Sequence, residues 1–363
     1  MKAAVLKNFK EPLELVEFPR PEVGEGEALV RITAAGICGS DVHMWLGEDP
    51  RTPLPMILGH EGVGVIEELG GKVTDLQGRE LAVGEPVIWD RAIVCGKCYF
   101  CAVKKLPNMC TSRWVYGIHR GCADAPHLNG GYADHILLVR GTKIISLADW
   151  DDLDPAALVS AGCSGATSAN AIELADIKMG DSVLVQGAGP LGLFLVGYAK
   201  ARGADKVIVI EGVDSRMELA KRLGAELVID FRSTSPEERR EIVMGATRDL
   251  GVDAAFEAVG RPEPVVEGIK LVRSGGAYLS VGTAVPMGTI PIDLYHDIVR
   301  RQIRLQGVWT NDTRHICDAL YLVRHNRQVF ADMITHRFPL EKANEALQSM
   351  AERKAIKTAI VAE

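Results

Sequence analysis

The sequence contains no long hydrophobic run and no long run of charges of one sign. No stretch of about 18 apolar residues occurs. The stretch Lys2–Lys7, which combines lysines with apolar residues, follows Met1, and no apolar leader segment is found there. We therefore expect a cytoplasmic protein that is not inserted in a membrane. The 41 basic and 48 acidic residues are mixed along the chain and give a net charge of −7, so nothing favours nucleic-acid binding.

Cysteine is scarce, and repeats, low-complexity tracts and Ser-rich linkers are absent. Eight cysteines in 363 residues are too few for a disulfide scaffold, and their clustering indicates thiolates that hold metal in a reducing compartment. Hydrophobic residues make up 47% and charged residues 25%, which is typical of globular domains with buried cores. At roughly 100–200 residues per domain, this length predicts two domains.

The first 150 or so residues alternate short apolar runs with Gly and Pro, which is typical of a β-rich domain with long loops. The strand candidates are residues 28–37, 62–69, 85–93 and 132–139. Asp154 is a good N-cap and Pro155 suits the first helical position, so we expect a helix that runs through Cys163.

The second half alternates apolar strand candidates with helical segments, which predicts a doubly wound parallel sheet in an α/β fold. The strand candidates are residues 183–186, 207–210, 227–230, 254–258, 277–282 and 303–307. After residue 310 we expect two amphipathic helices and a strand at 358–361 that pack on the first domain. The predicted domains are 1–163 with 311–363, and 164–310.

A glycine-rich turn follows the strand candidate 183–186 and opens a helix. Gly187, Gly189 and Gly192 form G-x-G-x-x-G around Pro190 and Leu191. Glycines allow the tight turn, and a helix N-terminus offers free N–H groups to a pyrophosphate. This context predicts a dinucleotide site, although a glycine-rich turn without a ligand would have the same sequence.

Glu211 ends the next strand candidate, where an acid binds the adenosine ribose hydroxyls. A 2′-phosphate about 4 Å from this carboxylate would be repelled by roughly 1 kcal/mol per charge pair in water, so NAD is favoured over NADP. Arg216 lies close enough in sequence to cap the adenosine end of either cofactor. Val259 and Val281, near the ends of the next two strand candidates, complete the predicted cofactor-binding set.

Four cysteines lie within residues 95–110, a segment with few apolar residues. Cys95, Cys98, Cys101 and Cys110 have the spacing C-x2-C-x2-C-x8-C. Four thiolates fit a closed, structural zinc site, which does no chemistry itself. An iron–sulfur cluster or disulfides remain alternatives, but the ferredoxin run continues with x3-C-P and this one does not.

A second set of metal-binding residue types is Cys38, His60 and Cys163. One imidazole and two thiolates would leave the fourth zinc position open for water or substrate. Singly, each has a structural explanation, because a buried Cys often acts as a small hydrophobe and a His before Gly is often a turn residue. Spacing alone leaves both interpretations open.

Several motifs, taken in order, resemble the zinc-dependent alcohol dehydrogenases of the medium-chain dehydrogenase/reductase superfamily over essentially the whole chain. They are G-I-C-G-S-D-V-H at 36–43, G-H-E-G-V-G at 59–64, the four-cysteine segment, G-C-S-G-A-T-S at 162–168, V-Q-G-A-G-P-L-G at 185–192, and I-T-H-R-F-P-L-E-K-A-N-E-A at 334–346. The resemblance implies a GroES-like catalytic domain and a Rossmann domain. The fourth cysteine comes one residue later than in the commoner pattern.

By this resemblance, Cys38, His60 and Cys163 are the catalytic zinc ligands, and Glu61 is the carboxylate beside the metal. Each subunit would then hold one catalytic and one structural zinc. Asp41 corresponds to the acid that orients the zinc-binding imidazole.

Ser40 and His43 correspond to the proton relay, which passes the substrate proton through the nicotinamide ribose to solvent. The structural alternatives are an N-cap for Ser40 and a surface position for His43.

The resemblance implies hydride transfer between NAD(H) and a secondary alcohol or polyol in a homodimer or homotetramer. Polyol-oxidising relatives often carry Glu at the position of Cys163. The cysteine here therefore favours simple alcohols over polyols as substrates. Residues 303–307 are the candidate sheet edge for pairing between subunits. Two alternatives stay open: an NADPH-dependent quinone-reductase-like enzyme, whose branch lacks the Cys and His set, and a non-catalytic protein that binds zinc and dinucleotide.

Overall fold

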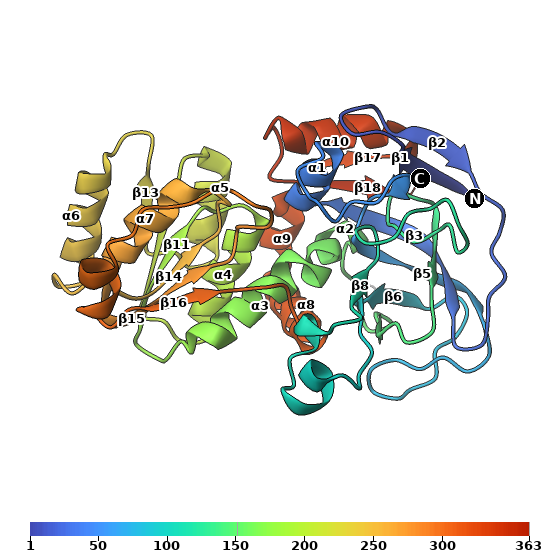
Figure 1. Ribbon diagram of the computed structural model, residues 1–363, viewed down its shortest axis with the longest axis horizontal. Helices are drawn as coiled ribbons and strands as arrows, with labels where there is room; N and C mark the ends of the chain where they lie inside the picture. Colours follow the sequence, from blue (N-terminus) through green and yellow to red (C-terminus); the bar gives the residue numbers. More distant parts are fainter. Residues whose placement is uncertain (151, 363) are drawn as a thin grey trace. The chain divides into compact units, whose positions relative to one another are not determined.

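The computed structural model describes residues 1–150 and 152–362. The chain divides into two compact units, and each contains more than one chain segment (Figure 1). The first unit comprises Met1–Cys163, Asp312–Ile316 and Phe330–Glu363. The second comprises Ser164–Asn311 and Cys317–Val329.

The first unit is β-rich, as predicted. A three-stranded sheet has the order β2-β1-β4, and a seven-stranded sheet runs β10-β6-β5-β3-β18-β17, with β9 also paired to β3. These strands are β1 (Lys2–Leu6), β2 (Glu14–Glu17), β3 (Ala28–Ile37), β4 (Met56–Ile57), β5 (Glu61–Leu69), β6 (Pro86–Trp89), β9 (His135–Leu138), β10 (Ile144–Ser146), β17 (Ile334–Phe338) and β18 (Lys357–Val361). The predicted run 85–93 is divided, because β7 (Ala92–Ile93) leaves the sheet and pairs with β8 (Trp114–Val115).

The C-terminal strand returns to the first unit, as expected from the sequence. Strand β18 pairs antiparallel with β3, with Thr358 opposite Ile37. Strand β17, which the sequence analysis missed, pairs parallel with β18. Within the described part of the chain, three α-helices follow residue 310 instead of the predicted two: α8 (Arg314–His325), α9 (Arg327–Met333) and α10 (Ala343–Ala351).

Residues 317–329 are a correction to the predicted domains, because they belong to the second unit. Helix α8 packs there through its apolar side. A Cβ atom on Gly165 would lie 2.7 Å from Ala319, and one on Gly197 would lie 3.0 Å from Leu322. The amphipathic pattern predicted this helix correctly but does not tell which core its apolar side contacts.

The second unit confirms the doubly wound parallel sheet, with the strand order β13-β12-β11-β14-β15-β16. The strands are β11 (Ser182–Gln186), β12 (Lys206–Glu211), β13 (Leu227–Asp230), β14 (Val252–Glu257), β15 (Val272–Ser280) and β16 (Arg304–Gly307). The order reverses between β11 and β14, which is where such sheets bind ligands.

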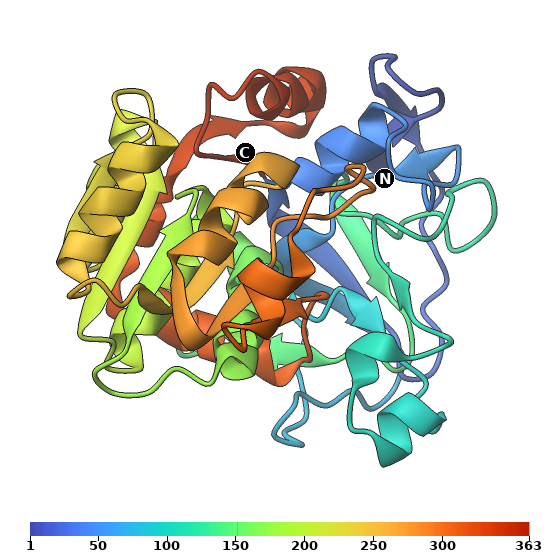
Figure 2. The ribbon, with the colours of Figure 1, turned by 60° about the vertical axis from the view of Figure 1, so that its left-hand side comes forward.

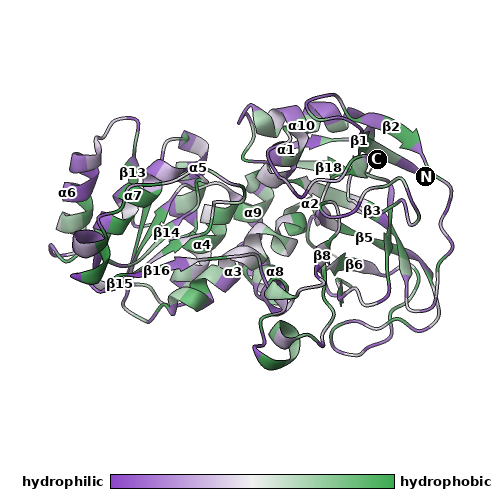
Figure 3. Cartoon of the chain, in the orientation of Figure 1, coloured by the Kyte–Doolittle hydropathy of each residue, from purple (hydrophilic) through white to green (hydrophobic). Residues whose placement is uncertain are grey.

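Helices cover both faces of this sheet. Helices α6 (Pro236–Ala246) and α7 (Pro262–Leu271) lie on the near face in Figure 2. They pack on the sheet through Val243, Val265 and Ile269. The sequence analysis did not predict α7. Because crossovers are right-handed, α4 (Pro190–Ala201) and α5 (Asp214–Arg222) lie on the other face. Figure 3 shows α4 as hydrophobic and α6 as mainly hydrophilic, in agreement with the extensive burial of α4.

The helix predicted from Asp154 through Cys163 is shorter and interrupted. The Asp154 carboxylate caps α2 (Pro155–Leu158) by accepting the Ala156 N–H at 3.0 Å, as predicted. A tighter turn, Val159–Gly162, follows, and α3 (Ser164–Ala175) then begins. Cys163 lies between them with φ −131° and ψ −86°, a non-helical conformation that ends the first helix. In the described residues, no helix combines the length and apolarity that crossing a membrane requires.

Candidate metal and dinucleotide sites

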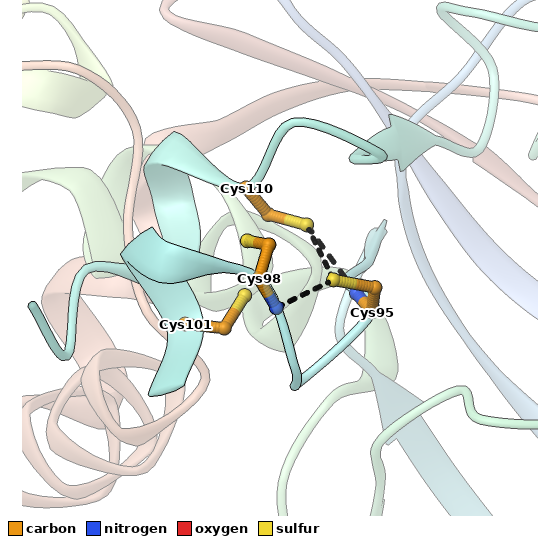
Figure 4. Close-up of side chains that lie close together, drawn as sticks. All are labelled: Cys95, Cys98, Cys101 and Cys110. Carbon is orange, nitrogen blue, oxygen red and sulfur yellow. Dashed lines mark hydrogen bonds between the residues drawn. The ribbon is translucent and has the colours of Figure 1, made fainter. Parts of the chain in front are cut away.

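The four cysteines of residues 95–110 converge in the first unit (Figure 4). Their sulfur atoms all lie within 4.8 Å of one another. The Cys95 N–H donates to Cys110 Sγ and the Cys98 N–H donates to Cys95 Sγ, both at 3.3 Å. Backbone N–H groups of Cys101 and Thr111 lower the pKa of Cys98 to about 6, which favours the thiolate that binds metal.

The surrounding segment has little core of its own. Tyr99 is 57% exposed and Val103 is 64% exposed, and the short helices Tyr99–Val103 and Pro107–Met109 bury no side chain. The sulfur atoms of Cys95 and Cys110 are 3.5 Å apart, well beyond a disulfide length of about 2.05 Å. Four convergent thiols in a segment without a core fit a structural zinc ion.

The second candidate cluster comprises Cys38, His60, Glu61 and Cys163, and all four belong to the first unit. One ligand atom from each lies within 4.8 Å of the others, and His60 Nε2 is 3.3 Å from Cys163 Sγ. His60 and Glu61 are buried. We call this set the catalytic-type cluster.

Small residues make room for this cluster. Gly59 precedes His60 with φ +90°, and a Cβ atom there would lie 2.5 Å from the Tyr132 ring. Gly36 on β3 is opposite Glu61 on β5, and its Cβ would lie 2.3 Å from Glu61 Oε2. A larger residue at position 36 would collide with the Glu61 carboxylate, and one at position 59 with the Tyr132 ring, so both positions favour glycine.

Asp41 contacts two members of the cluster, His60 and Cys38. Its Oδ1 lies 3.2 Å from His60 Nδ1, and its Oδ2 accepts the Cys38 N–H at 2.8 Å and the Tyr132 hydroxyl at 3.1 Å. Burial lowers the pKa of His60, but Asp41 and the Cys38 thiol outweigh it and raise the pKa to about 10. Asp41 therefore fixes the Nδ1 side of the ring and leaves Nε2 facing the cluster, where a neutral imidazole can bind metal.

Lys357 was not predicted as a site residue. Its Nζ lies 2.5 Å from Glu61 Oε2, and both side chains are buried. Burial raises the pKa of Glu61, although the charge of Lys357 opposes this. Glu61 Oε1 has no hydrogen-bond partner in the described residues. A buried carboxylate oxygen beside two thiols and an imidazole is a donor set that suits zinc.

Ser40 and His43 lie on α1 (Gly39–Trp45), three residues apart and therefore on one side of the helix. His43 Nδ1 lies 2.6 Å from Glu48 Oε2, a contact that the sequence analysis missed. Both Ser40 and His43 are half-buried.

The glycine-rich turn has the geometry that its sequence predicts. Gly187 has φ +90°, and a Cβ on Gly192 would lie 1.8 Å from the Gly187 carbonyl oxygen, so only glycine fits. Gly189 is the N-cap of α4, and Pro190 and Leu191 are its first residues. The free N–H groups of this first turn can bind a phosphate.

Glu211 lies at the end of β12 and is 5% exposed. Its carboxylate accepts the N–H groups of Ala188 at 2.7 Å, Gly212 at 2.6 Å and Val213 at 3.0 Å. Arg216 Nη1 is 4.0 Å from Glu211 Oε2. The carboxylate is therefore fixed beside the glycine-rich turn.

Val259 and Val281 follow β14 and β15, and Glu257, which the sequence analysis missed, connects them. The fully buried Glu257 accepts the N–H of Val259 at 2.6 Å and of Gly260 at 2.5 Å through its carboxylate. The Val281 N–H donates to the Glu257 carbonyl at 3.1 Å.

Comparisons with known proteins match both halves of the chain. Residues 24–149 match the family described as alcohol dehydrogenase GroES-like domain, and residues 190–324 match the family described as zinc-binding dehydrogenase. A 5-exo-hydroxycamphor dehydrogenase of Pseudomonas putida is 34% identical over 352 residues, which cover 96% of this chain and 95% of that protein.

Two solved structures are also similar. An alcohol dehydrogenase from Thermotoga maritima is 44% identical, with a TM-score of 0.96, and the match covers 100% of this chain and 99% of that one. A protein from Sinorhizobium meliloti, described as a zinc-binding dehydrogenase and solved with NADP, is 27% identical with a TM-score of 0.84 and 99% coverage of each chain.

Proposed function

Since the chain belongs to the zinc-dependent alcohol dehydrogenases of the medium-chain dehydrogenase/reductase superfamily, we propose that it transfers hydride from a secondary alcohol or polyol to NAD. The observation that carries this proposal is the convergence of Cys38, His60, Glu61 and Cys163 within 4.8 Å. The glycine-rich turn of the second unit supplies the matching cofactor site.

Cys38, His60 and Cys163 would hold the catalytic zinc, with Glu61 beside it. By analogy with bound water, whose pKa falls from about 15.7 to about 7, the metal supplies roughly 12 kcal/mol toward ionising the substrate hydroxyl. Asp41 orients His60 and holds the Cys38 backbone. Cys95, Cys98, Cys101 and Cys110 would hold the structural zinc.

Ser40 and His43 form the proposed proton relay. Ser40 Oγ accepts the substrate proton, and His43 passes it to solvent. Glu48 fixes the ring by its 2.6 Å contact with His43 Nδ1. A positioned relay contributes about 10²–10⁴-fold, so it is secondary to the metal.

NAD is the proposed cofactor because Glu211 ends β12 beside the glycine-rich turn, where an acid favours ribose hydroxyls over a 2′-phosphate. Its fixed carboxylate would accept hydrogen bonds from ribose hydroxyls and repel a phosphate. Arg216, 4.0 Å away, and the NADP-bound relative favour the alternative. The ratio of kcat/KM with NAD to kcat/KM with NADP decides between them.

We propose a homo-oligomer through the edge strand β16. The side chains near this edge include several exposed apolar ones: Leu294, Tyr295, Val299 and Leu305. Covering them would remove an exposed sheet edge and apolar surface from water. Sedimentation of the wild type and of Leu305→Glu tests this pairing, and a monomeric wild type would exclude it.

A panel of neutral and charged secondary alcohols and polyols, assayed by NADH absorbance with zinc-loaded protein, tests the proposed function. We expect turnover of at least one class, together with two zinc ions per chain. One tightly held zinc ion and no turnover would instead support the non-catalytic alternative.

A further inference from the structure

Glu257, the last residue of β14, is a buried acid that the proposed function does not use. The residue is 0% exposed. Its Oε1 accepts the N–H groups of Val259 at 2.6 Å and Gly260 at 2.5 Å, and its Oε2 accepts the Gly282 N–H at 3.1 Å. Hydrogen bonds to an ionised carboxylate are roughly twice as strong as those between neutral groups. One side chain therefore fixes two separate loops.

The two loops follow neighbouring strands of the parallel sheet. Val259 and Gly260 come after β14, and Gly282 comes after β15, which pairs with β14. The backbone of Glu257 contacts the second loop as well, because its carbonyl oxygen accepts the N–H groups of Val281 at 3.1 Å and Gly282 at 2.9 Å. Both the side chain and the backbone of Glu257 thus join the carboxyl ends of these two strands.

The two loops pack directly on each other around this carboxylate. A Cβ atom on Gly282 would lie 2.7 Å from Glu257 Oε1 and 2.7 Å from the Gly260 nitrogen. Gly260 has φ +75°, and a Cβ atom there would lie 2.9 Å from the Gly282 carbonyl oxygen. Both positions therefore favour glycine, which lets the loops approach the buried acid.

The loop after β14 also contacts the glycine-rich turn. A Cβ atom on Gly187 would lie 2.9 Å from Val259 Cγ2 and 3.1 Å from the Ala258 carbonyl oxygen. The Ala258 N–H donates to the Gln186 carbonyl at 2.9 Å, which joins the loop to the strand before the turn. Val259 is 45% exposed, so its side chain borders the turn and is accessible to a ligand.

The strand order indicates which half of a dinucleotide these loops would meet. A dinucleotide bound where the strand order reverses, between β11 and β14, has one mononucleotide half on each side of that point. Glu211, at the end of β12, belongs to the side proposed for the adenosine. Strands β14 and β15 lie on the other side, which leaves their ends for the nicotinamide half.

We propose that Glu257 is a positioning residue for the nicotinamide half of the cofactor, because its carboxylate fixes the loops after β14 and β15 in the arrangement that receives the nicotinamide ring. Glu257 acts through the backbone of these loops and does not itself contact the ring. Loops that are fixed before binding lose less conformational freedom when the ligand binds. The inference rests on the dinucleotide site of the proposed function, but it requires neither zinc nor an alcohol.

The affinities for NADH and for ADP-ribose, which lacks the nicotinamide ring, test the proposal together. Glu257→Gln keeps the size of the side chain but replaces one acceptor oxygen by an NH₂ donor, so one loop loses its acceptor in either orientation of the amide. We expect the Kd for NADH to rise about tenfold and the Kd for ADP-ribose to change by less than about twofold. NADH fluorescence and calorimetry measure the two affinities.

Asp253→Asn is the matched control. Asp253 is near the other end of β14, and its carboxylate also accepts a backbone N–H, from Ser182 at 2.7 Å. This variant loses the same charge on the same strand, and it should leave the ratio of the two affinities unchanged. Equal weakening of NADH and ADP-ribose in Glu257→Gln, or no weakening of either, would show that Glu257 does not position the nicotinamide half.

A second variant decides the question if Glu257→Gln does not fold. Gly282→Ala keeps the carboxylate but places a Cβ atom 2.7 Å from both Glu257 Oε1 and the Gly260 nitrogen, which would force the loops apart. A loss of affinity for NADH alone would support the proposal. An equal loss for both ligands, or no loss, would overturn it.

These outcomes are distinct from a failure of the proposed function. If the weakening is specific to NADH but the zinc-loaded wild type oxidises no alcohol, the proposed function fails and the inference stands. If the wild type oxidises an alcohol but neither variant weakens NADH specifically, the inference fails and the proposed function stands. A wild type that binds neither NADH nor ADP-ribose would overturn both.

Discussion

Lys357 Nζ lies 2.5 Å from Glu61 Oε2, and this ion pair is buried at the catalytic-type cluster. It joins the last strand of the chain to the strand that follows His60. Removing one partner of a buried ion pair destabilises the fold, because the other charge is left uncompensated.

Lys357→Met should therefore lower the free energy of unfolding by about 3–5 kcal/mol. The double variant Glu61→Gln with Lys357→Met should lose less than the sum of the two single variants. Urea unfolding of the four proteins measures this coupling, and strictly additive losses would show that the pair is not coupled.

His43→Ala should reduce kcat by about 10²–10⁴-fold, because the substrate proton loses its positioned acceptor. Zinc content and the affinity for NAD should not change, since His43 belongs to neither site. Steady-state kinetics with elemental analysis check this, and wild-type kcat in the variant would remove His43 from the relay.

Gly192→Ala should abolish dinucleotide binding, because its Cβ would lie 1.8 Å from the Gly187 carbonyl oxygen and would distort the turn. Gly245→Ala on α6 is the control, since a Cβ there meets nothing within 4 Å. Titration of NADH fluorescence compares the two variants. Similar affinities for NADH in both would argue against the assigned cofactor site.

His119 makes a specific contribution to the pH dependence of stability. The unfolded chain protonates this ring near 6.5, whereas burial and the charges of Arg51 and Arg113 lower the folded pKa to about 4. The unfolding free energy should therefore decrease as the pH falls from about 6.5 to about 4. His119→Gln should show a smaller decrease in denaturant titrations across this window, and parallel curves for the two proteins would contradict the assignment.

The sequence predicted features that depend on local spacing. The glycine-rich turn, the cap at Asp154 and the parallel sheet follow from residues close together in the chain, and the structure has all three. The break at Cys163 was missed, because it depends on a backbone conformation and not on a Gly or Pro signal.

Contacts between distant segments could not be predicted. Lys357 reaches the catalytic-type cluster through tertiary structure, and its own neighbours in the sequence carry no recognisable motif. Glu48 contacts His43 from only five residues away, but no motif marks it. The placement of residues 317–329 in the second unit could not be predicted either, because the apolar side of an amphipathic helix does not specify which core it packs on.

The central claim is that the chain holds two zinc ions, of which only the one at Cys38, His60 and Cys163 takes part in catalysis. Elemental analysis of Cys38→Ala, measured together with turnover, tests it most directly, with Cys317→Ala as the control because that thiol is exposed. We predict one zinc ion per chain and no turnover in Cys38→Ala, against two zinc ions and full turnover in Cys317→Ala. Two zinc ions and wild-type turnover in Cys38→Ala would contradict the account.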